Sequence, residues 1–350
     1  AMVYSAASSS IQQQQQQQRQ HRRPLLVRLH SLHSPVVVEQ IAKNLNLNLK
    51  QDDQKNGRGD DGGGGDGDDD HSKEKDLRVV HLVRHAEGYH NVNKDYRNPQ
   101  NIDAQLTPHG ITQCQELSQR LQKKQQEEMK QKQLEEKREE QEFHHHDLFL
   151  LDPNNVECII TSPMRRAIQT AYHSFEHILT SSSSSSSSSP KSSESPKSSQ
   201  SPIPFVACEN WRETMNYVCD VRSPLTRLRN DFPFVDFSNV EHEHDPISKY
   251  YEDRHGSFEE HTMHRESDDD EALRERIENA WKTIARRPES SIAVVSHSAF
   301  FMHMFTRSQQ LGGIVLSYED DDVRNLMTLE GGFGNCEMRS VAVEIVTAGS

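Results

Sequence analysis

Short apolar runs separated by longer amphipathic segments form the pattern of the chain from residue 77 onward. Three runs predict buried strands, at residues 77–83, 156–160 and 292–295. None alternates cleanly between polar and apolar side chains, which favours a sheet covered on both faces. A fourth run, at 341–346, predicts an edge or closing strand. The polar interruptions of the runs are single residues, namely Arg78, His81 and Glu157.

Amphipathic segments between these runs predict helices. The expected helices cover residues 108–121, 164–179 and 270–286. The first has a start signal, since Thr107 is suited to cap it and Pro108 is favoured at a first helical position. Strands that alternate with helices indicate βαβ units. We therefore expect an α/β fold, a three-layer α/β/α sandwich with an open, mainly parallel sheet.

Low-complexity segments dilute this foldable pattern. Residues 1–76 contain a glutamine run and an Asp/Gly tract, which cannot bury enough apolar surface to offset the entropy lost on ordering. We expect a disordered arm at 1–76 and a folded domain at 77–350. Two insertions interrupt that domain: a Gln/Lys/Glu run at about 122–147, whose composition suits a solvated helix, and a serine- and proline-rich loop at about 180–202.

The composition of the arm leaves two locations open. Its first 38 residues hold arginines and serines but no acidic side chain, which is typical of an organelle transit peptide. A disordered low-complexity arm explains the same composition. We expect a cytoplasmic protein, with organelle targeting through the arm as the alternative.

Charge and hydropathy exclude several classes of protein. The 54 acidic side chains outnumber the 40 lysines and arginines, and the net charge of −14 argues against nucleic-acid partners and a polybasic membrane binder. No run approaches the roughly 18 apolar residues of a membrane span, so we expect a soluble protein. The five cysteines are scattered without a C-x-x-C pair, which fits a reducing compartment and offers no cysteine zinc site.

Polar clusters follow three of the predicted strands directly. They occupy residues 84–91, 161–167 and 296–298. Because open α/β sheets bind ligands at the carboxyl ends of their strands, we expect the clusters to meet at one edge of the sheet. Guanidinium groups clamp phosphate, and a histidine at a strand end is suited to attack phosphorus. The clusters therefore predict phosphoryl chemistry.

Together the three clusters resemble the histidine phosphatase superfamily, the phosphoglycerate mutase-like proteins. The matches to its R-H, S-P-x-x-R-A and S-H signatures come in the family's order, and each follows a predicted strand. The matching residues are Arg84, His85, Ala86 and Asn91, then Ser162, Pro163, Arg166 and Ala167, then Ser296 and His297. Residues 219–222, 231–233, 236–238 and 334–340 resemble a branch of plant and fungal members.

The resemblance implies a phosphoglycerate mutase-like fold and a phosphohistidine mechanism that uses no cofactor and no metal. His85 is then the nucleophile, while Arg84, Arg166 and His297 surround the phosphoryl group. Asn91 matches an asparagine on the phosphate side. These roles agree with the needs of phosphoryl transfer, which are positioning and positive charge around the equatorial oxygens.

A glutamate completes the implied site. The segment Trp211-Arg212-Glu213 resembles the R-E segment of the family, so Glu213 is expected to protonate the leaving oxygen and then to activate water. Glu209 and Glu87 are competing acids. Glu213 is preferred because only it follows the R-E pattern.

Histidine-rich segments raise the question of a metal site. The groups are His144 to His146, and His242 and His244 with Asp245. Consecutive histidines cannot all face one ion, and neither group has the i, i+4 spacing of a helical zinc motif. We expect polar surface loops at both places.

Three functions fit these residues. The favoured one is a phosphomonoesterase that acts on a small phosphorylated substrate, and the alternatives are a phosphoglycerate mutase and a catalytically silent binding or scaffold protein. Gly88 and His90 stand where true mutases of the family usually carry serine and tryptophan, and residues 211–216 depart from their N-E-R-x-Y-G run. Both departures favour the phosphatase. Three arginines could bind a second anionic group of the substrate, but we expect each to be an exposed surface charge: Arg222, Arg227 and Arg229.

Overall fold

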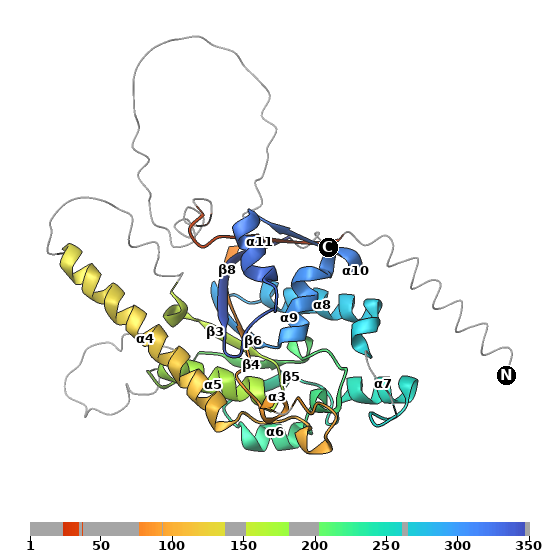
Figure 1. Ribbon diagram of the computed structural model, residues 1–350. Helices are drawn as coiled ribbons and strands as arrows, with labels where there is room; N and C mark the ends of the chain where they lie inside the picture. The colour runs from red at the N-terminus through yellow and green to blue at the C-terminus, as the bar shows by residue number, and fades with distance from the viewer. Residues whose placement is uncertain are drawn as a thin grey trace, which may run out of the picture.

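A mixed, mostly parallel sheet lies at the centre of the protein (Figure 1). The computed structural model describes residues 24–34, 37, 77–92, 94–136, 152–181, 203–260 and 265–346. Within them, eight strands form one sheet in the order β5-β4-β3-β6-β2-β8-β1-β7. Only β8 is antiparallel to its described neighbours, β2 and β1. The strands are β1 (Leu25–His30), β2 (Leu77–Arg84), β3 (Cys158–Thr161), β4 (Phe205–Cys208), β5 (Asp236–Asn239), β6 (Ser291–Ser296), β7 (Ile314–Tyr318) and β8 (Met338–Val346).

Helices cover both faces of this sheet (Figure 1). One hydrophobic core receives side chains from α8, α9 and α11, and the core on the other face receives them from α4, α5 and α6. The helices are α3 (Tyr89–Val92), α4 (Pro108–Glu136), α5 (Arg165–Ser181), α6 (Leu225–Asp231), α7 (Pro246–His255), α8 (Asp270–Ala285), α9 (Ser298–Thr306), α10 (Ser308–Leu311) and α11 (Asp321–Thr328). The expected three-layer α/β/α architecture is confirmed.

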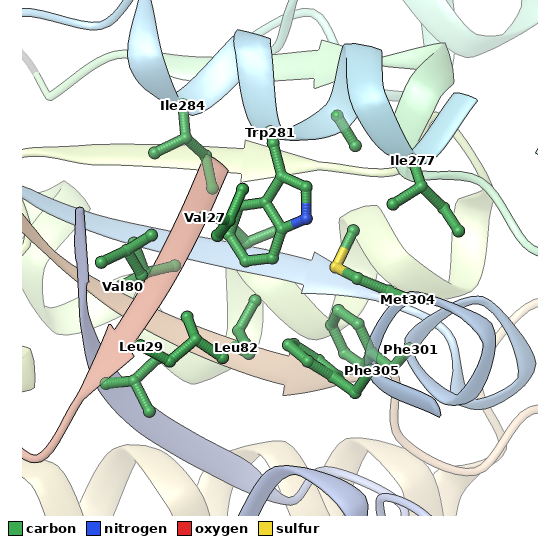
Figure 2. Packing of buried hydrophobic residues seen from close by; sticks show 14 of the residues in the cluster. Val27, Leu29, Val80, Leu82, Ile277, Trp281, Ile284, Phe301, Met304 and Phe305 are labelled. Carbon is green, nitrogen blue, oxygen red and sulfur yellow. The ribbon is translucent and has the colours of Figure 1, made fainter. Parts of the chain in front are cut away.

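Figure 2 shows the core that α8 and α9 cover. Side chains of β1 and β2, among them Val27, Leu29, Val80 and Leu82, lie in the same cluster as the fully buried indole of Trp281. Successive side chains of a strand point to opposite faces of a sheet. The apolar run of β2 therefore supplies both cores, which explains why it showed no polar alternation.

The polar residues that interrupt β2 have partners inside the protein. The Nδ1 of His81 lies 2.8 Å from Ser340 Oγ on β8, and its Nε2 lies 3.4 Å from Ser291 Oγ on β6. Arg78 donates to the carbonyl oxygen of Arg287 at 2.7 Å. Hydrogen bonds of this kind allow an interior strand to carry buried polar groups.

Strand β1 lies inside the predicted N-terminal arm. Residues Leu25–His30 pair with β7 on one side and β8 on the other, so the expectation of disorder is wrong for them. Their side chains alternate, with Leu25, Val27 and Leu29 buried and Arg28 exposed, and the surrounding low-complexity tracts concealed this short pattern. The glutamine run and the Asp/Gly tract lie outside the described residues, as do residues 182–202 of the serine- and proline-rich insertion.

Other elements also differ from the prediction. Helix α4 continues past residue 121 to Glu136, so the first part of the Gln/Lys/Glu insertion is helical, as its composition suggested, while residues 137–151 lie outside the described part of the chain. Strand β8 is interior, between β2 and β1, and not an edge. Strands β4, β5 and β7 were not predicted. Strand β5 buries only Phe237, β7 buries only Ile314 and Leu316, and the four-residue β4 comes just after the serine- and proline-rich insertion. None of the described helices combines the length and the hydropathy that a bilayer crossing requires.

Candidate active site

A cavity lies at the carboxyl end of β2, where the polar clusters meet. Its volume is about 610 Å³, and its walls come from the end of β2, residues 213–220, the start of α9, and the end of α11 with the residues after it. Four of the six candidate residues line this cavity: Arg84, His85, Asn91 and Glu213. The other two, Arg166 and His297, are fully buried close to His85.

His85 directly follows β2 and lines the cavity. The His85 N–H donates to the carbonyl oxygen of Ser296 at 2.9 Å, which ties the end of β2 to β6. The imidazole is buried, and its Nδ1 lies 2.7 Å from the carbonyl oxygen of Ala86. Because a carbonyl oxygen only accepts, Nδ1 carries the proton and Nε2 keeps its lone pair. His85 is therefore oriented to act as a nucleophile through Nε2.

Burial keeps the histidines of this site neutral. Burial, and then the positive charge of Arg166, lower the pKa values of His85 and His297 well below the usual value. Burial, with Arg166 and Arg84 adding to it, lowers the pKa of His90 to about 2. Neutral imidazoles retain a lone pair at neutral pH, as nucleophilic attack requires.

His297, directly after β6, brings two of the sequence clusters together. Its ring centre lies 5.0 Å from that of His85, and its Nε2 lies 2.8 Å from the hydroxyl oxygen of Ser162, which follows β3. The Nδ1 of His297 is buried and has no hydrogen-bond partner among the described residues. With Nε2 accepting from the Ser162 hydroxyl, Nδ1 carries the proton and is suited to donate to a ligand oxygen beside the nucleophile.

Two arginines supply positive charge next to His85. Arg84 donates from Nη1 to the carbonyl oxygen of Phe333 at 2.7 Å, and burial lowers its pKa. Arg166 donates from Nη1 to the carbonyl oxygen of Cys219 at 3.0 Å, and its Nη2 lies 3.4 Å from Asp220 Oδ1. The Nε of each arginine has no partner within the described residues. Each guanidinium is thus anchored yet keeps donors for an anion.

Glu213 is held at the N-terminus of α9. Its Oε1 accepts hydrogen bonds from the N–H groups of Thr214 and Phe300, both at 2.9 Å, and its Oε2 accepts a longer one from Ala299 at 3.4 Å. The positive end of the helix dipole favours a carboxylate at this place. Oε2 is the less strongly bonded oxygen and is the better placed to meet a ligand in the cavity.

The competing acids bind other residues. The Oε1 of Glu209 lies 2.7 Å from the Nε of Arg222, and the Oε1 of Glu87 accepts from the hydroxyl of Thr107 at 2.7 Å. Neither glutamate lines the cavity. The geometry therefore favours Glu213 among the three.

Sequence reasoning assigned no role in the site to His90 and Asp220, which are among the other residues of the cavity wall. The ring centre of His90 lies 5.4 Å from that of His85, and a Cβ at position 88 would come within 2.8 Å of the His90 ring. The pairing of Gly88 with His90 in the sequence could therefore have indicated that the His90 ring lies beside the nucleophile. Burial, and then the charge of Glu213, raise the pKa of Asp220 to about 6. No sequence signal reveals its contact with Arg166, because the two residues are 54 positions apart.

The histidine-rich groups do not form a metal site in the described structure. Asp245 is buried and accepts from Arg212 at 2.8 Å, while His242 and His244 are exposed. Among the described residues, no group of three or more His, Cys, Asp or Glu side chains is placed to hold a metal ion. The run from His144 to His146 lies outside the described residues.

The buried histidines predict a loss of stability in acid. Burial lowers the pKa of His81 to about 3, whereas the unfolded chain has the ordinary value near 6.5. Below pH 6.5 the unfolded state therefore binds a proton that the folded state does not, and stability falls as pH falls, by about 1.4 kcal/mol per pH unit for each such histidine. We expect His81→Asn to reduce the loss between pH 7.5 and pH 5 by about 2 kcal/mol. Urea unfolding at both pH values measures this, and equal losses in the two proteins would contradict it.

Comparisons with known proteins identify relatives of the chain. A phosphoglycerate mutase-like protein of Arabidopsis thaliana is 32% identical over 282 residues, covering 76% of this chain and 84% of that protein. Phosphoglycerate mutase-like protein 2 of the same plant is 27% identical over 304 residues, covering 75% and 73%. No family model matches the chain.

Among solved structures, phosphoglycerate mutase from Bacillus anthracis aligns with a TM-score of 0.37 at 12% identity, covering 79% of this chain and 93% of that one. The Arabidopsis relatives identify the family. The identity to the first of them over most of both proteins shows that the chain belongs to the histidine phosphatase superfamily, the phosphoglycerate mutase-like proteins.

Proposed function

We propose that this protein is a phosphomonoesterase that transfers the phosphoryl group of a small phosphorylated substrate first to His85 and then to water. The observation that carries the proposal is the buried imidazole of His85, whose Nδ1 lies 2.7 Å from the carbonyl oxygen of Ala86, so that Nε2 is left to attack. It lines a cavity together with Arg84 and Glu213. A nucleophile, a cation and a carboxyl group around one cavity are the parts that phosphoryl transfer requires.

In the first step, the Nε2 lone pair of His85 attacks phosphorus and the bond to the leaving oxygen breaks. Glu213 has to bind a proton before this step, against the preference of the α9 N-terminus for a carboxylate, and it gives that proton to the leaving oxygen, so the alcohol departs neutral and Glu213 becomes a carboxylate. Arg84, Arg166 and the unpaired Nδ1 side of His297 meet the equatorial oxygens, where negative charge is spread in the transition state. Asn91 helps to shape this end, since its Oδ1 accepts from the Gly88 N–H at 3.0 Å.

In the second step, water attacks phosphorus and gives a proton to the Glu213 carboxylate. The phosphorus–nitrogen bond breaks, and its electron pair returns to Nε2 of His85. Inorganic phosphate leaves, and both side chains regain their starting protonation states. The hydrogen bond from Nδ1 to Ala86 persists through both steps and holds the ring in place.

The mutase is the weaker alternative. It would retain the phosphoryl group on His85 and return it to a reoriented glycerate. Serine, the usual mutase residue at position 88, would place its Cβ 2.8 Å from the His90 ring. This chain therefore pairs glycine with histidine where mutases pair serine with tryptophan, and the surroundings of the nucleophile differ accordingly.

Phosphate release tests the proposal. The purified full chain is incubated in excess chelator with p-nitrophenyl phosphate and with 2- and 3-phosphoglycerate, and inorganic phosphate and the ratio of the two glycerate phosphates are measured. We expect phosphate release from p-nitrophenyl phosphate. Interconversion of the phosphoglycerates without net release would favour the mutase. The absence of both reactions in a folded protein would favour a silent binding protein.

A further inference from the structure

The cavity is far larger than a phosphoryl group, and its outer lining selects among phosphomonoesters. We infer that the substrate is the monoester of an uncharged, largely apolar alcohol and that phosphoglycerates fit poorly. The inference rests on the proposed function and adds the chemical class of the leaving group. It depends on three observations: the charges that line the cavity, the positions of the nearby arginines, and the apolar side chains of one wall.

The positive charge at the cavity is concentrated at its phosphoryl end. Among the described residues that line it, Arg84 is the only arginine or lysine, and it lies beside His85 at the phosphoryl end. Glu213, Asp220 and Glu330 add acidic groups to the lining. A carboxylate on the substrate would lose water and meet no opposite charge, which is unfavourable. Arg84, together with the buried Arg166 beside His85, serves the phosphoryl group itself.

Nearby arginines are not free to receive a second anion. The side chain of Arg222 is fully buried and donates to the carbonyl oxygen of His242 at 2.8 Å. Arg227 is exposed on α6 and lies 3.7 Å from Asp231. Neither arginine lines the cavity, and neither does Arg229. Among the described residues that line the cavity, a second anionic group on the substrate therefore meets no further arginine or lysine.

Apolar side chains from α9, from α11 and from the residues after α11 form one wall. They include Met302, Met327, Leu329 and Phe333. Met302 is 45% exposed and Leu329 is 57% exposed, so apolar surface faces the cavity and remains to be covered by a ligand. Elsewhere the lining includes the paired rings of Tyr96 and Tyr217, with centres 5.5 Å apart. Such surfaces favour an apolar leaving group.

Matched substrates test the charge part of the inference. We compare 4-(carbamoylmethyl)phenyl phosphate with 4-(carboxymethyl)phenyl phosphate, which differ in charge but little in size. Their phenol leaving groups have similar reactivity, because the methylene separates the charged group from the ring. We expect kcat/KM for the neutral amide to exceed that for the acid by about tenfold or more. Equal values, with p-nitrophenyl phosphate hydrolysed, would overturn the inference and leave the proposed phosphatase standing. If no compound, including p-nitrophenyl phosphate, is hydrolysed, both proposals fail together.

A second pair tests the apolar part. Heptyl phosphate and 2-(2-methoxyethoxy)ethyl phosphate have leaving groups of equal length, and the ether is the better leaving group. We expect heptyl phosphate to have a KM severalfold lower, because its chain covers the apolar wall. A lower KM for the ether would contradict an apolar site.

A variant pair assigns the selectivity to the cavity wall. Leu329→Lys places a cation in the lining, and Leu326→Lys makes the same change at an exposed leucine of α11 outside the lining. We expect Leu329→Lys to raise the ratio of acid to amide turnover by about threefold or more and Leu326→Lys to leave the ratio unchanged. An equal effect of both variants would assign the selectivity to overall charge and would contradict the role of this wall.

Discussion

Replacement of His85 by asparagine is expected to abolish phosphate release while the protein remains folded. The substitution removes the only nitrogen that we assign to attack phosphorus, and loss of a covalent nucleophile lowers turnover by at least about a thousandfold. His85 directly follows β2, and its side chain lines the cavity. The effect should therefore appear in kcat and not in the free energy of unfolding.

A matched control is available on the same strand. His81 is also fully buried, four residues earlier, and the proposed reaction does not use it. We expect His81→Asn to lower stability but to keep the activity of the folded molecules. Acid-labile phosphate on the wild-type chain after rapid quenching, absent from His85→Asn, would identify the intermediate. Turnover near the wild-type level in His85→Asn would refute the proposed nucleophile.

The elements that the sequence predicted correctly share one property. Strands β2, β3, β6 and β8 are interior, so both of their faces are covered and they read as continuous apolar runs. Strand β5 has one buried side chain in four residues, so its sequence contains no apolar run from which a strand could be predicted. The interior position of β8 and the inclusion of β1 in the sheet depend on pairings between distant parts of the chain. The local pattern of polar and apolar residues contains no information on such pairings.

The residues of the candidate site likewise fall into those that the sequence could predict and those that it could not. Sequence motifs predicted the residues that lie directly after strands, such as His85 and His297, because the fold class places strand ends together. Asp220 was missed, since its contact with Arg166 joins a helix start to a loop 54 residues later. The cavity wall of Met302 and Leu329 likewise arises from α9 and α11 packing side by side. These features define which ligand fits, and they follow from tertiary packing.

Deletion of residues 1–34 is expected to unfold much of the domain, because it removes β1 from the interior of the sheet. Leu25, Val27 and Leu29 are buried in the core beneath α8 and α9. Burial of three such side chains contributes about 5–9 kcal/mol, which is comparable to the whole free energy of unfolding of a typical domain, about 5–15 kcal/mol. In addition, β7 pairs with β1 on its only described side, so β7 would lose its place in the sheet.

A deletion that ends at Arg23 leaves every residue of β1 in place, and we expect it to retain the fold and the activity. Circular dichroism melting curves of both deletions measure the difference. Val27→Asp in the full chain tests the same strand without a deletion, with Val315→Asp as the control, because Val27 is fully buried and Val315 is 45% exposed on the neighbouring β7. Burial of an unpaired carboxylate is strongly destabilising, whereas a solvated one is tolerated. If the 1–34 deletion melted like the full chain, β1 would not be part of the folded domain, and the domain would begin near residue 77 as the apolar pattern alone suggests.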